Sequence, residues 1–128
     1  MRRILAVVVF VCASLMLTFG TAMAQDPIKV GPSIYKKILE NDRVRMLEVT
    51  FAPGDSIAFH SHPDHAVYTV TGGTLRVTTS DGKTMVADLK AGDPIWFSAV
   101  THAAKNIGTT ALKLLVVELK EKPAQKAK

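Results

Sequence analysis

The chain has 128 residues, of which 48% are hydrophobic, and its formal net charge at pH 7 is +5. This length suits one domain with a modest core. The charge is mild, and no basic cluster is interleaved with aromatic residues, so the composition argues against a nucleic-acid-binding protein.

The N-terminus has the pattern of a secretory signal peptide. Basic residues at Arg2 and Arg3 precede an uncharged apolar run over residues 4–19, and small residues at Ala22 and Ala24 form a cleavage site. An uncleaved membrane anchor is the alternative, but the run is shorter than the roughly 20 residues that a span needs. We therefore predict a signal peptide over 1–24, cleavage after Ala24, a periplasmic or secreted protein and no stable membrane association afterwards.

The remaining chain is predicted to form short strands separated by turns. A lead-in marked by proline and glycine covers 25–33, and a Lys-rich stretch over 120–128 is expected to be a flexible, solvated tail. Alternating and β-rich segments between them predict strands over 35–39, 44–51, 57–62, 66–71, 74–79, 84–89, 94–97, 102–106 and 111–119. The Asp81-Gly82 pair predicts a hairpin between two of them. Since no long apolar stripe recurs at helical spacing, we expect a single all-β domain over 34–119.

The four histidines are confined to two short segments and indicate a metal site. Side chains two residues apart on a strand share a face, so His60 and His62 project together, about 6–7 Å apart. His102 follows Trp96 and Phe97 in an apolar segment, where burying an unpaired imidazole would cost free energy. Imidazole suits divalent Fe, Mn, Ni, Cu or Zn and does not select among them.

These two segments resemble the two sequence motifs of the cupin superfamily. The first motif runs Gly, five residues, His-x-His, three or four residues, Glu, six residues, Gly; it is matched here by Gly54, His60, His62 and Gly72 or Gly73. The second ends in His-x3-Asn and is matched by Gly92, His102 and Asn106, although its loop lacks the usual proline and glycine and is one residue shorter. The resemblance implies a double-stranded β-helix, that is, a jelly-roll barrel, with one metal ion inside it and a homodimeric assembly.

The sequence departs from the motif at the glutamate that normally completes the ligand set. Counting back from Gly72 leads to His65, and counting back from Gly73 leads to Ala66. The site therefore has four histidines in the first case and three in the second. Asp64 could supply a carboxylate, but it follows Pro63 and is expected to cap a turn.

Two functions from different classes fit this pattern. One is an exported, metal-dependent cupin acting on a small molecule in the barrel as an oxidoreductase of the dioxygenase type, or as an isomerase. The alternative is a non-catalytic periplasmic module that binds or senses a metal or small molecule, and a third reading leaves the histidines lining a metal-free pocket. Tyr35 and Arg45 could face the substrate, while Tyr68 and Trp96 are expected in the core or the pocket wall.

Overall fold

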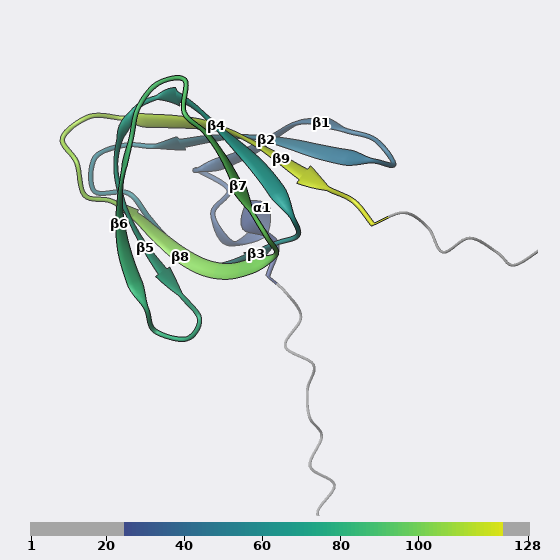
Figure 1. Cartoon of the computed structure of the whole chain (residues 1–128), viewed down its shortest axis with the longest axis horizontal. Helices are drawn as coiled ribbons and strands as arrows, with labels where there is room; N and C mark the ends of the chain where they lie inside the picture. Colours follow the sequence, from purple (N-terminus) through teal and green to yellow (C-terminus); the bar gives the residue numbers. More distant parts are fainter. Residues whose placement is uncertain (1–24, 122–128) are drawn as a thin grey trace, which may run out of the picture.

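A computed structural model of the protein describes residues 25–121, and the predicted signal peptide lies outside them. Within these residues, nine strands form two sheets around a shared interior, and one short helix precedes them in the chain (Figure 1). The elements are α1 (Pro27–Val30), β1 (Tyr35–Glu40), β2 (Val44–Phe51), β3 (Ser56–His62), β4 (His65–Thr71), β5 (Gly73–Thr79), β6 (Thr84–Leu89), β7 (Pro94–Phe97), β8 (Val100–Asn106) and β9 (Leu112–Leu119). The all-β prediction is confirmed. The first and last residues of every predicted strand lie within two residues of those of the observed strand. Across residues 25–121, no helix has the length and apolar character that crossing a membrane requires.

The two sheets are antiparallel and join strands that are distant in the sequence. The five-stranded sheet has the order β1-β2-β9-β4-β7, and the four-stranded sheet has the order β3-β8-β5-β6. The chain crosses from one sheet to the other between β2 and β3 and again between β3 and β4. This is the double-sheet jelly roll that the motifs imply.

The interior is apolar at one end and polar at the other. Along β9, the buried face begins with Leu112, Leu114 and Val116 and ends with Glu118. The neighbouring strand β2 adds the fully buried Leu47 to the apolar end. Burial of such a side chain contributes about 1.5–3 kcal/mol, so this half of the barrel stabilises the half that carries the polar groups.

An irregularity in β3 sets the direction of its histidines. The pairing of β3 with β8 shifts register between Ile57 and His60. Ile57 is buried, Phe59 is 46% exposed, and His60 and His62 are buried. A bulge of this kind lets residues at odd spacing, here Ile57 and His60, face the same side. Phe59 precedes His60 and therefore faces outward by alternation.

The structure adds one element to the lead-in and corrects one expectation. The lead-in, to which the sequence analysis assigned no element, contains helix α1, because the Asp26 side chain accepts a hydrogen bond from the Ile28 amide and Pro27 occupies the first turn. Tyr68 and Trp96, expected in the core or the pocket wall, are 50% and 56% exposed. They project from the outer face of the five-stranded sheet, where alternation along β4 and β7 directs them away from the interior.

Candidate metal centre

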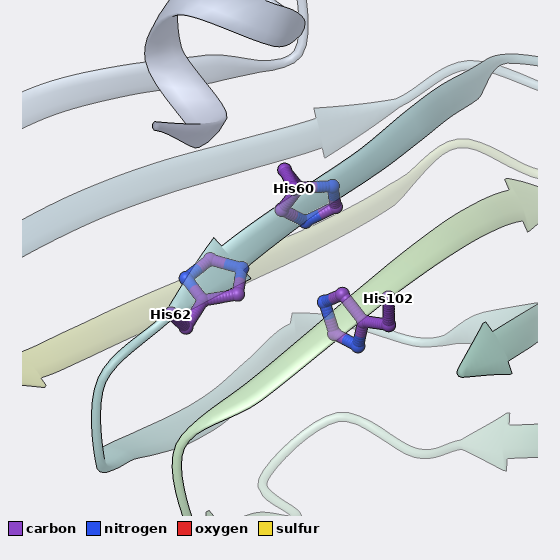
Figure 2. Close-up of side chains that lie close together, drawn as sticks. All are labelled: His60, His62 and His102. Carbon is purple, nitrogen blue, oxygen red and sulfur yellow. The ribbon is translucent and has the colours of Figure 1, made fainter. Parts of the chain in front are cut away.

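Three of the predicted histidines meet inside the barrel. His60 and His62 lie on one face of β3, and His102 on β8 is paired in register with His60. The ring centroids are 4.9 Å apart for His60 and His62, and 4.7 Å apart for His60 and His102. Each ring offers one nitrogen within 4.8 Å of the others, and Figure 2 shows the three side chains converging from the two strands.

Hydrogen bonds fix which nitrogen of two of these rings carries the proton. Nδ1 of His60 lies 2.8 Å from the carbonyl oxygen of Ala58, and Nδ1 of His62 lies 2.6 Å from Oε1 of Glu118. A carbonyl or carboxylate oxygen only accepts, so both Nδ1 atoms donate, and in the neutral form of each ring the lone pair is on Nε2. Two Nε2 lone pairs directed into a shared space fit a transition-metal ion.

Burial favours the neutral form of His60 and His102. It lowers the pKa of His60 to about 4 and the pKa of His102 to about 3. Only the neutral ring offers a lone pair, so both side chains are in the ligating form near pH 7.

His65 faces the same interior from the opposite sheet. It is 2% exposed, whereas the next residue, Ala66, is exposed on the outer face. Its Nδ1 donates to the carbonyl oxygen of Pro63 at 2.7 Å, and its ring centroid lies 4.7 Å from that of His62. The odd spacing from His62 is accommodated because β3 and β4 belong to different sheets. Of the two sequence alternatives, His65 is thus the inward-facing residue, although it is not one of the three histidines within 4.8 Å of one another.

A buried carboxylate that the sequence analysis missed supports His62. Oε2 of Glu118 accepts a hydrogen bond from Nε of Arg45 at 2.6 Å, and Arg45 Nη1 donates to Oδ2 of Asp26 at 2.6 Å. Burial raises the pKa of Glu118, but the hydrogen bonds from His62 and Arg45 outweigh burial and hold this pKa below its usual value. A continuous polar chain therefore connects α1 to the candidate metal centre. The signal in the sequence is Glu118 itself, a charge at the next inward position of an apolar alternating strand.

Tyr35 completes the wall of the site, while Arg45 acts through Glu118. The Tyr35 hydroxyl lies 3.3 Å from Nε2 of His60 and 3.5 Å from Nε2 of His62. Burial and then the charge of Glu118 raise the pKa of Tyr35, so the group remains a neutral O–H donor. Of the two residues expected to face a substrate, only Tyr35 contacts the histidines.

Asn106 and Asp64 have structural roles. Asn106 is fully buried and donates from Nδ2 to the carbonyl oxygens of Phe51 and Thr110. Asp64 accepts a hydrogen bond from the amide of Ala99 in the loop between β7 and β8. Neither belongs to the compact group of possible ligand residues, and the asparagine of the second motif stabilises the fold of this chain.

A cavity of about 80 Å³ adjoins the histidines and continues into the apolar half of the barrel. His62, His65 and His102 border one part of it, and most of its remaining wall is aliphatic. Any ion held by the histidines would therefore face this cavity.

Comparison with known families agrees with this geometry. The model of the cupin domain family matches residues 47–118, which is more than half of the chain. The protein belongs to the cupin family. No protein of curated function matches it.

Solved structures support the same assignment. A cupin domain from Bordetella pertussis is similar, with 28% identity and a TM-score of 0.64 over 69% of this chain and 93% of that chain. A protein with a double-stranded β-helix domain from Klebsiella pneumoniae has 26% identity and a TM-score of 0.54, over 70% and 84% of the two chains. A cupin superfamily protein from Desulfitobacterium hafniense, at 22% identity and a TM-score of 0.53 over 69% and 77%, is similar in fold alone. The predicted family and jelly-roll fold are confirmed.

Proposed function

We propose that this protein is an exported cupin that holds one divalent transition-metal ion through His60, His62 and His102. The observation that carries the proposal is the convergence of these three rings, whose ligand atoms lie within 4.8 Å of one another. Hydrogen bonds commit Nδ1 of two of the rings and leave Nε2 free. A metal-free pocket would leave these nitrogens with only the weak contacts to Tyr35. The candidate ions are Fe, Mn, Ni, Cu and Zn.

His65 is proposed as a fourth ligand. Its ring is buried and its Nδ1 is committed to Pro63, as the Nδ1 of His60 is committed to Ala58. His65 lies outside the group formed by His60, His62 and His102. Its ring therefore has to move toward the ion and should be the weakest of the four ligands. His65→Ala should keep one ion per chain and lower the affinity less than His102→Ala does. Titration of the metal-free variants with Co(II) measures the stoichiometry and the affinity. A His65→Ala variant that binds Co(II) as tightly as the wild type would remove His65 from the ligand set.

The chemistry proposed for the site is that of a small-molecule oxidoreductase of the dioxygenase type. An ion held by neutral imidazoles keeps its charge and open coordination positions, so it supplies Lewis-acid or redox chemistry to a ligand bound there. The protein contributes the neutral hydroxyl of Tyr35, which can donate a hydrogen bond to that ligand, and the apolar barrel wall, which excludes water.

A non-catalytic binding or sensing role is the second candidate. It is favoured by one observation: the buried carboxylate nearest the site, Glu118, is engaged by both His62 and Arg45 and is not free to act as a base. Oxygen consumption by the iron-loaded protein with thiols, diketones and phenols separates the two functions. The oxidoreductase proposal expects uptake with at least one class, abolished in His102→Ala and retained in Lys105→Ala on the exposed face of β8. Iron-loaded protein that is inert with the whole panel would favour the binding role.

Export is proposed from the N-terminal pattern and from the contacts of the first residues after it. The Gln25 carbonyl accepts a hydrogen bond from the Ser61 amide, between His60 and His62. The folded part of the chain therefore extends to the residue that follows the predicted cleavage site. After expression of the full-length chain in a bacterial host, the protein should be recovered in the periplasmic fraction, and mass spectrometry should give a chain that starts at Gln25. Protein that stays in the cytoplasm with an intact N-terminus would contradict export.

A homodimer is also proposed, together with a small-molecule ligand in the barrel and no nucleic-acid partner. The outer face of the five-stranded sheet exposes Leu39, Tyr68 and Trp96, at 46%, 50% and 56%. Exposed apolar side chains on one sheet face are typical of protein contacts. Sedimentation should give a dimer that Trp96→Glu weakens, and a monomeric wild type would refute it.

A further inference from the structure

We propose that the ligand bound at the metal centre places a small, uncharged apolar group of about three or four heavy atoms in the adjoining cavity. This inference rests on the proposed metal site and adds the chemical class of its ligand. It follows from the wall, the charges and the size of the cavity.

The wall of the cavity beyond the histidines is apolar. Strands β5 and β6 contribute Leu75, Val77 and Ala87, and strands β4 and β7 contribute Val67 and Phe97. The surface that these side chains offer can make van der Waals contacts but cannot pair with a polar group. Transfer of a hydrocarbon group from water to such a surface is favourable, and the gain grows with each CH₂ that is buried.

Charged groups are absent from the part of this wall that the structure describes. The nearest buried cation, Arg45, uses Nε for Glu118 and Nη1 for Asp26, and its side chain is 17% exposed. The Tyr35 hydroxyl beside the histidines is the polar exception in this wall. A carboxylate or ammonium group deeper in the cavity would therefore be desolvated without a charged partner, which weakens its binding. This excludes ligands such as amino acids if their charged end must enter the barrel beyond the ion.

The volume limits the length of the group. An engineered apolar cavity of about 150 Å³ binds benzene, which has six heavy atoms. The cavity here, at about 80 Å³, is roughly half as large, so it fits about three or four heavy atoms on the same scale.

Met85 connects the cavity to the surface, because its side chain borders the cavity and the residue is 54% exposed. It belongs to β6, the edge strand of the four-stranded sheet. An unbranched methionine changes rotamer readily, so Met85 marks the place where a small ligand would enter.

The inference is tested on the Co(II)-loaded full-length mature protein with short thiols that have two or three carbons and differ in charge. 1-Propanethiol, cysteamine and 3-mercaptopropionate all offer one sulfur to the ion, and binding is followed by the visible spectrum of Co(II). The charge of the ion alone would favour 3-mercaptopropionate. The cavity instead predicts that 1-propanethiol binds at least tenfold more tightly than either charged thiol, and that 1-octanethiol binds at least tenfold more weakly than 1-propanethiol. Equal or tighter binding of a charged thiol would overturn the inference.

Two variants test whether the selectivity between thiols arises in the cavity. Ala87→Phe should fill the cavity and remove the preference for 1-propanethiol without changing Co(II) affinity, whereas Ala66→Phe, on the outer face of β4, should change neither. If Ala87→Phe does not fold, Val77→Ala enlarges the cavity and should improve binding of 1-pentanethiol relative to 1-propanethiol. Unchanged selectivity in a folded cavity variant would overturn the inference. Failure of the protein to bind Co(II) before any thiol is added would refute the metal site instead, so the two failures are distinguishable.

Discussion

Glu118 shows how a residue outside the ligand set can control the candidate metal centre. Its carboxylate holds the Nδ1 proton of His62, and Arg45 and Asp26 in turn hold the carboxylate. A hydrogen-bonded carboxylate orients the imidazole and makes Nε2 a better donor to the ion. Glu118 is therefore a positioning residue of the metal centre.

Glu118→Gln should lower metal affinity by about 10- to 100-fold, because an amide cannot serve both His62 and Arg45 as an anionic acceptor. Competition between the protein and a chelator for Co(II) measures the effect. Glu48→Gln is the matched control: this carboxylate lies on β2 at a surface position 3.6 Å from Lys113 and should leave the affinity unchanged. A folded Glu118→Gln protein with wild-type affinity would contradict the positioning role.

At the scale of elements, the strands and their turns were predictable, because alternation and turn residues are local properties of the sequence. The bulge in β3 was not predictable, since it depends on pairing with β8, and it brings Ile57 to the same side as His60. Nor could the sequence place Glu118 beside His62, because those residues are 56 positions apart and meet only across two sheets. The histidines were found because their spacing is a local signal, whereas the partners that orient them are contributed by distant strands.

Asn106 connects β8 to the end of β2 and to the loop between β8 and β9, and it should matter for stability rather than for metal binding. It donates to the carbonyl oxygens of Phe51 and Thr110 and accepts from the Gly108 amide. Asn106→Ala should lower the free energy of unfolding by about 2–4 kcal/mol, because buried groups lose their partners. Urea denaturation measures this.

A matched control is Asn41→Ala, which removes an exposed turn acceptor for the amides of Arg43 and Val44. Water can replace that acceptor, so the loss should be below about 1 kcal/mol. Equal losses in the two variants, or an Asn106→Ala protein that folds normally but no longer binds metal, would contradict the structural role.

At the scale of the whole molecule, the barrel combines an apolar half that stabilises it with a polar half that contains the histidines. The fold and the ligating residue types could be predicted from the sequence. The size of the cavity and the absence of charge from its described wall could not, because they depend on how nine strands pack. The exposure of Tyr68 and Trp96 is a similar case, since aromatic residues suit either face of a strand.

The stability of the metal-free protein should fall as the pH is lowered from about 6.5 toward 4. Burial lowers the folded-state pKa of His60 to about 4 and of His102 to about 3, below the ordinary value of 6.5. Below pH 6.5 the unfolded chain binds protons that the folded chain does not, so acid favours unfolding, and the loss levels off once the pH passes the folded-state values. Urea denaturation at pH 7.5, 6.5, 5.5 and 4.5 measures it.

The pH dependence of the unfolding free energy should be smaller in a His102→Gln variant, because this variant lacks one of the imidazoles that take up a proton on unfolding. Carboxylates such as Glu118 have pKa values below their ordinary values and affect stability only at lower pH. Stability that is constant between pH 7.5 and 4.5, or that rises on acidification, would show that the histidines are not held neutral by burial.

The most direct test of the central claim is the metal content of the mature protein isolated from its own compartment. Elemental analysis should give one divalent transition-metal ion per chain in the wild type and in Lys105→Ala. His60→Ala, His62→Ala and His102→Ala should each lose the ion while the protein remains folded. Wild-type protein that contains no ion and accepts none of Fe, Mn, Ni, Cu or Zn on reconstitution would contradict the account.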